Sequence, residues 1–84
     1  MKRSIKAQTR VCNGDILTYF LLTDGNQYGV EITLTEKGKT SSNRCLDLCR
    51  RKIIALRFLR ELTRAQVYPI HLSEIIRDFD FAHL

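Results

Sequence analysis

The sequence predicts an α+β fold: a three-stranded antiparallel β-meander followed by two α-helices packed on one face of the sheet. Three observations lead to this prediction. Residues 4–36 contain three β-rich stretches separated by glycine-containing turn signals. Residues 44–66 lack Gly and Pro and show helical spacing of apolar positions, and a second, shorter helical pattern follows Pro69. At 84 residues, the chain is expected to form a single domain spanning 1–84.

The three strands are expected from side-chain alternation. Residues 4–12 alternate between apolar and polar, as in a half-exposed strand. Residues 16–23 are apolar on both faces, which suits the central strand of three, and residues 27–36 alternate again. Turn signals at 13–15 and 24–26 connect these strands, because Asn and Gly tolerate positive φ.

Residues 37–43 are polar and are expected to form a loop that leads into a long helix over residues 44–66. The helix ends before Pro69, because the residue that precedes a proline avoids helical angles. A second helix is expected over residues 70–80. The apolar face of the long helix contains Cys45, Leu48, Cys49, Ala55, Leu56, Leu59 and Leu62.

The length of the first hairpin loop decides which side chains share a face of the sheet. A two-residue loop divides the apolar residues between both faces, whereas a three-residue loop at 13–15 gathers them on one face. We favour the three-residue loop because the sheet then needs a hydrophobic core on one face instead of on both. The expected core face contains Ile5, Ala7, Val11, Leu17, Tyr19, Leu21, Tyr28, Val30, Ile32 and Leu34.

This register leaves Ile16, Phe20 and Leu22 on the open face of the sheet. Apolar side chains gathered on a surface often mark an interface. The plainer interpretation is that three scattered apolar residues are normal on a surface, or that the termini cover them. On the first interpretation these residues form a protein interface, and a homodimer is its natural form because most soluble oligomers are symmetric.

Charge suggests a second class of partner. The net charge is +5, and residues 44–66 carry seven basic side chains against two acidic ones. Helical spacing places Arg50, Arg57, Arg60 and Arg64 on one ridge, where guanidinium groups contact phosphates of RNA or DNA, or an acidic partner. The alternative is a solvated face, or one that pairs within the molecule with acidic residues of the second helix. These acidic residues are Glu74, Asp78 and Asp80.

Catalysis and metal binding are not expected. Cys45 and Cys49 have the i, i+4 spacing that, with His71 or His83, suits zinc. This spacing is unspecific, and both cysteines fall on the predicted core face, so we expect no metal and no cofactor. The sequence contains none of the nucleophile, phosphate-loop or zinc-protease motifs. The predicted function is therefore non-enzymatic: a small protein-interaction or regulatory module.

A cytoplasmic location is expected. The longest nearly apolar run, residues 16–22, is too short to span a membrane, and no apolar region follows the basic N-terminus as in a secretory signal. The three cysteines are an odd number, whereas secreted disulfide scaffolds usually have an even number.

Two stretches resemble a family of short bacterial proteins of unknown function that join a β-meander to a helix and a closing V-x-P-x-H-L segment. The first is Tyr28-Gly29-Val30 with Ile32. The second contains Val67, Pro69, His71, Leu72, Ile75, Ile76, Asp78 and Phe79. The resemblance implies that the second helix belongs to the fold. It implies no activity and does not cover the arginine-rich helix.

Overall fold

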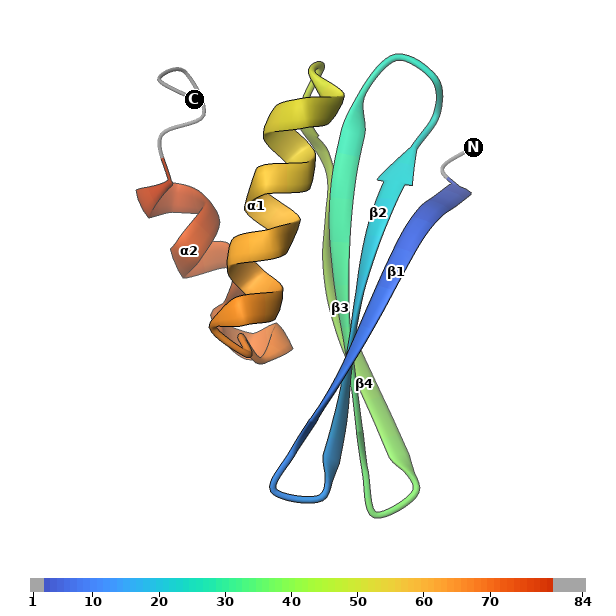
Figure 1. Cartoon of the computed structure of the whole chain (residues 1–84), viewed down its shortest axis with the longest axis vertical. Coiled ribbons are helices and arrows are strands. Elements are labelled where there is room, and N and C mark those ends of the chain that lie inside the picture. The colour runs from blue at the N-terminus through green and yellow to red at the C-terminus, as the bar shows by residue number, and fades with distance from the viewer. Residues whose placement is uncertain (1–2, 80–84) are drawn as a thin grey trace.

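The computed structural model describes residues 3–79 and contains one antiparallel sheet with two helices against one of its faces (Figure 1). The predicted α+β class is confirmed, but the predicted strand number is wrong, because the sheet has four strands in the order β1-β2-β3-β4. The elements are β1 (Arg3–Cys12), β2 (Asp15–Thr23), β3 (Tyr28–Glu36), β4 (Lys39–Cys49), α1 (Lys52–Arg64), a 3₁₀ turn η1 (Pro69–His71) and α2 (Leu72–Asp78).

Strand β4 replaces the predicted loop over 37–43 and the first turns of the predicted helix over 44–66. Lys37 and Gly38 both have positive φ, 49° and 79°, and form a two-residue hairpin loop in which Glu36 pairs with Lys39. Pairing with β4 satisfies the backbone groups along the outer edge of β3, which a three-stranded sheet leaves open. Helix α1 therefore begins only at Lys52.

A close approach between β3 and β4 requires glycine at position 29. The pairing shifts between Tyr28, opposite Cys49, and Val30, opposite Cys45, so residues 46–48 bulge opposite Gly29. A Cβ atom at position 29 would lie 2.3 Å from the carbonyl oxygen of Cys45. The bulge bends β4 at the end of the sheet from which the chain continues into α1.

The first hairpin has a two-residue loop, so the favoured three-residue loop is wrong. Asn13 and Gly14 have φ of 52° and 86°, and Cys12 pairs with Asp15. Two consecutive positive φ values match the twist of the flanking strands, which favours this loop. The one-residue change of register moves Ala7 and Val11 from the expected core face to the open face.

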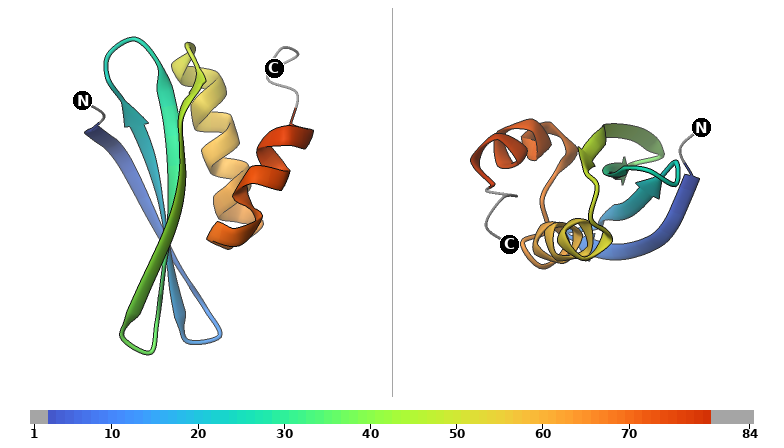
Figure 2. Two further views of the ribbon diagram at one scale, coloured as in Figure 1. Left: turned by 180° about the vertical axis from the view of Figure 1, so that it is seen from behind. Right: turned by 90° about the horizontal axis from the view of Figure 1, so that it is seen from above.

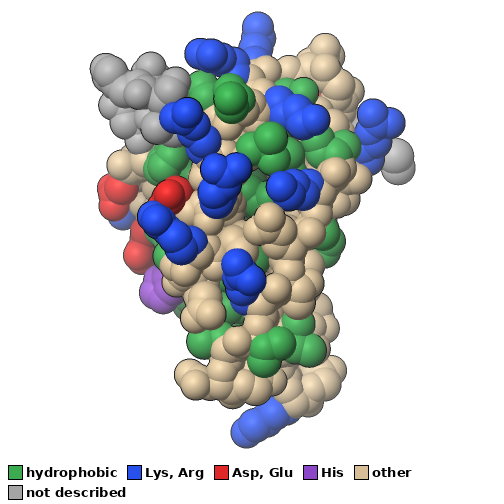
Figure 3. All heavy atoms as spheres, in the orientation of Figure 1, with side chains coloured by type: hydrophobic (Ala, Val, Ile, Leu, Met, Phe, Trp, Pro, Cys, Tyr) green, Lys and Arg blue, Asp and Glu red, His purple; other side chains and the backbone are tan. Residues whose placement is uncertain are grey.

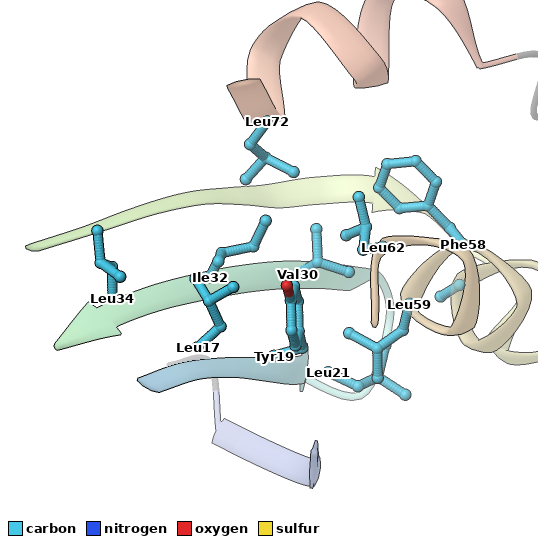
Figure 4. Close-up of a cluster of buried hydrophobic side chains, with 11 residues drawn as sticks. Leu17, Tyr19, Leu21, Val30, Ile32, Leu34, Phe58, Leu59, Leu62 and Leu72 are labelled. Carbon is cyan, nitrogen blue, oxygen red and sulfur yellow. The ribbon is translucent and has the colours of Figure 1, made fainter. Parts of the chain in front are cut away.

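The core lies between the helices and the face of the sheet formed by alternate residues of β2 and β3 (Figure 4). Phe58, which the predicted apolar face of the helix omitted, is fully buried, and its ring centroid lies 4.7 Å from that of Phe79. The buried cluster contains Leu17, Tyr19, Leu21, Val30, Ile32, Leu34, Ala55, Phe58, Leu59, Leu62 and Leu72.

Two side-chain hydrogen bonds connect the segment between α1 and α2 to the sheet. The Asn43 side-chain amide donates to the carbonyl oxygen of Pro69 over 3.1 Å, and the Tyr68 hydroxyl donates to the Asp15 carboxylate over 3.0 Å. Figure 2 shows α2 near the edge of the sheet that β4 forms, with α1 beside α2. Both helices therefore cover the same face. The last residue of the predicted helix over 70–80 lies outside the described residues.

Candidate interaction surfaces

The open face of the sheet, which points away from both helices, contains three rows of side chains that cross all four strands, and a partial fourth row that contains Ser4 and Leu22. The row nearest the β1–β2 loop contains Val11, Ile16, Thr35 and Thr40. The middle row contains Thr9, Thr18, Thr33 and Ser42. The third contains Ala7, Phe20, Glu31 and Arg44. These rows hold one acid and one base, which face each other on neighbouring strands, so they carry no net charge.

Apolar exposure on this open face is concentrated on β1 and β2. Val11 is 69% exposed and Ile16, its direct partner, is 43% exposed. Phe20 is half-buried beside the exposed Ala7. Leu22, the third residue of the predicted interface, is only 6% exposed. The sequence analysis missed Ala7 and Val11 because it favoured the wrong loop length, although Asn13-Gly14 is a strong signal for a two-residue loop.

The predicted arginine ridge is divided in the structure. Arg57, Arg60 and Arg64 lie on the exposed side of α1, opposite its buried residues. Arg50 precedes the helix and lines a separate hollow beside Asp24 in the β2–β3 turn. Strand β4 continues to Cys49 and α1 begins at Lys52, so Arg50 lies in the connection between them.

Two further cations join the three helical arginines from β1. Lys6 pairs with Leu21 and Arg10 pairs with Leu17, both of which are buried beneath the helices, so these cations lie on the helix-bearing face. Figure 3 shows basic side chains gathered over this side of the molecule. We call Lys6, Arg10, Arg57, Arg60 and Arg64 the basic face. The sequence analysis placed Lys6 and Arg10 on the opposite side of β1 from the core.

The electrostatics at Tyr19 agree with this placement of Arg10. The pKa of the Tyr19 phenol is raised to about 12, chiefly by burial and also by the nearby Cys12, while the positive charge of Arg10 acts to lower it. The guanidinium of Arg10 therefore lies close enough to act on a phenol in the core. The pKa of Tyr68 is also raised to about 12, chiefly by its hydrogen bond to Asp15.

Three of the four residues weighed for metal binding lie in the described part of the chain. Cys45 and Cys49 lie on β4, opposite Val30 and Tyr28, and His71 is exposed in η1. Within residues 3–79, no group of three or more His, Cys, Asp or Glu side chains has an arrangement that suits a metal ion. His83 lies outside the described residues.

The acidic residues of α2 have local partners. Glu74 lies 3.7 Å from a ring nitrogen of His71, and Asp78 lies 3.9 Å from the guanidinium of Arg77. Both carboxylates are exposed. Neither pairs with an arginine of α1 in the part of the chain that the structure describes. Asp80 lies outside that part.

A hollow of about 670 Å³ lies between α1 and α2. Its floor is apolar, and Arg57, Arg60 and Glu61 stand at its α1 side. The apolar lining consists of Phe58, Leu62, Ala65, Val67, Ile75 and Phe79. The described residues that line the hollow include no Ser, Cys or His. None of the described helices is both long and apolar enough to cross a membrane.

Comparison with known proteins gives one match. The model of a family of unknown function (DUF6514) matches residues 2–80. No protein of curated function and no solved structure matches the chain.

Proposed function

The chain belongs to the DUF6514 family of unknown function, and we propose that it is a non-enzymatic protein-interaction module that forms a homodimer through the open face of its sheet. The observation that carries this proposal is the uncovered pair Val11 and Ile16, 69% and 43% exposed at directly opposite positions of β1 and β2. Burial of apolar surface is the main driving force of protein association, and an exposed pair of this kind supplies it.

A second copy of the chain suits this surface better than another partner does, for electrostatic reasons. The chain carries a net charge of +5, so two copies repel each other at most orientations. The three rows of the open face carry one acid, Glu31, directly opposite one base, Arg44. When two such faces meet about a two-fold axis, Glu31 of each copy can approach Arg44 of the other. The face is therefore electrostatically self-complementary.

The chemistry of the open face supports a contact and not a reaction. Its remaining side chains are mainly threonines, whose branched carbons pack on a flat sheet while their hydroxyls remain available for hydrogen bonds across an interface. The proposal also places the protein in the cytoplasm, where the thiols of Cys12, Cys45 and Cys49, which form no disulfide in the structure, stay reduced.

The test compares one substitution at two exposed apolar sites. Val11→Glu places a charge in the proposed contact, whereas Ile70→Glu places the same charge on η1, where Ile70 is 78% exposed and outside the open face. Sedimentation velocity over a broad concentration range should show a dimer for the unmodified chain and for Ile70→Glu, and a monomer for Val11→Glu. Thermal unfolding should confirm that both variants fold.

Two results contradict the proposal. The first is an unmodified chain that stays monomeric at every concentration. The second is a Val11→Glu variant that dimerises as strongly as the Ile70→Glu control. Salt should not weaken the dimer, because the joined faces carry no net charge and salt screens the repulsion between two chains of net charge +5.

A further inference from the structure

We propose that the basic face binds the sugar–phosphate backbone of double-stranded nucleic acid. This surface and the open face belong to opposite sides of the sheet, so this inference is independent of the proposed dimer. The basic face differs from the arginine ridge predicted on a single helix, because two of its five cations lie on β1 and Arg50 is not part of it.

Tertiary structure brings these cations together. Lys6 and Arg10 are separated from the arginines of α1 by more than forty residues of sequence, yet α1 packs against the same face of the sheet on which they lie. Figures 1 and 3 show α1 and the basic side chains on the side that faces the viewer. The fold therefore concentrates like charges that the sequence keeps apart.

The basic face is short of internal counter-charge. Among residues 3–79, Arg64 is its one member in an ion pair, with Glu61, and both side chains remain exposed. Lys6, Arg10, Arg57 and Arg60 are also exposed. Five like charges gathered beside a single paired carboxylate, Glu61, among the described residues repel one another, and a bound polyanion relieves this repulsion. Arginine suits phosphate because its planar guanidinium group donates two parallel hydrogen bonds.

The dimensions of the surface match a run of phosphates. Arg57 and Arg64 are separated by about 10 Å along α1, and Lys6 and Arg10 by about 13 Å along β1. A strand of duplex nucleic acid advances about 3.4 Å per phosphate along its axis, so each row spans three to four phosphates. Two rows of cations on neighbouring elements can therefore follow the backbone without reading bases.

The composition of the surface favours a duplex over a single strand or an acidic protein. Single strands are usually held by exposed aromatic rings on which bases stack, and the large hydrophobic residues exposed within residues 3–79 include no aromatic one. Protein interfaces are depleted of charged residues at their centre, whereas all five members of the basic face are charged. Interfaces with nucleic acid are polar and strongly positive.

Salt dependence provides the test. Binding of a fluorescent 20-base-pair DNA duplex, followed by anisotropy, should weaken with salt with a log–log slope of about −4.5, because each of five phosphate contacts contributes about −0.9. The double variant Arg10→Gln/Arg57→Gln should bind more weakly and reduce the slope by about two. This variant removes one cation from each row.

A matched control removes two charges elsewhere. Lys39→Gln/Arg77→Gln changes β4 and α2 and lowers the net charge by the same amount. It should retain nearly all of the affinity. Equal losses in both double variants would show diffuse attraction and overturn the proposal, as would the absence of duplex binding at low salt. Tighter binding of polyglutamate or of a single strand than of the duplex would also overturn it.

Discussion

Tyr19, at the centre of β2, donates a hydrogen bond from its hydroxyl to the backbone carbonyl oxygen of Val67, 2.9 Å away. The phenol crosses the core to reach this acceptor, and Tyr19 has no exposed surface. The bond satisfies a polar group that burial would otherwise leave unpaired, which costs about 1–3 kcal/mol. It also fixes the position at which the chain leaves α1, and with it the orientation of α1 and its arginines over β1.

Replacing Tyr19 with Phe should lower the free energy of unfolding at neutral pH by about 1–2 kcal/mol, because the carbonyl of Val67 loses its donor. The difference should shrink in alkali. The folded-state pKa of Tyr19 is about 12 and its unfolded value is 10, so the fold stabilises the neutral phenol. This contribution is complete below pH 10 and is lost as the pH rises towards 12.

Urea unfolding of both proteins at several pH values between 7 and 11.5 measures this effect. Tyr68 titrates in the same way in both proteins and therefore cancels from the difference. A difference between the two free energies that stays constant across the alkaline range would contradict the assigned cause.

Gly29→Ala should destabilise the protein by about 3 kcal/mol, at the upper end of the cost of overpacking. The added Cβ would lie 2.3 Å from the carbonyl oxygen of Cys45 and 2.6 Å from that of Leu46, and neither backbone atom can move without disturbing β4. Gly38→Asn is the control, because nothing lies near Gly38 and Asn tolerates its positive φ of 79°. Thermal unfolding should separate the two variants clearly. Equal stability would mean that the bulge in β4 can relax.

Amide hydrogen exchange over residues 39–45, before the bulge in β4, should show protection that alternates along the chain. Strand β4 lies at the edge of the sheet and pairs only with β3, so alternate N–H groups point away from any partner strand. The helix that the sequence analysis expected from residue 44 would instead protect consecutive amides. NMR-detected exchange distinguishes these patterns, and continuous protection over residues 46–49 would favour the helix. Residues 52–64 of α1 provide the internal reference for helical protection.

Local pattern predicted most of the secondary structure because the deciding contacts are close in sequence. The alternation of residues 27–36 predicted β3, and helical spacing predicted the buried positions Ala55, Leu59 and Leu62. The error over residues 37–49 arose because the apolar spacing of Cys45, Leu48 and Cys49 fits a helical face. The competing demand is the unpaired edge of β3, which the helical spacing of residues 44–49 does not reveal. The missed local signal was Lys37-Gly38, whose positive φ values form the third hairpin loop, between β3 and β4.

The candidate surfaces were predicted less completely than the fold. Ile16 was correctly expected to be exposed on the open face, whereas Leu22 is buried. A shift of one residue moves a side chain to the other face of the sheet. The length of the loop at Asn13 therefore decides whether Val11 lies on the same face as Ile16 or on the opposite face. Arg57, Arg60 and Arg64 share a helix face as expected, since that relationship needs only the helical repeat.

The sequence by itself determined the α+β class, the positions of β1 to β3, the helix over Arg57 to Arg64 and the positive charge of the chain, because each depends on local periodicity or composition. Tertiary structure alone decided that β4 forms, that Val11 meets Ile16 on the open face, and that Lys6 and Arg10 join the arginines of α1. The first two outcomes depend on backbone pairing and register across two-residue hairpin loops, and the third depends on the packing of α1 against β1, more than forty residues away. Periodicity within a single element contains neither of these contributions to the free energy.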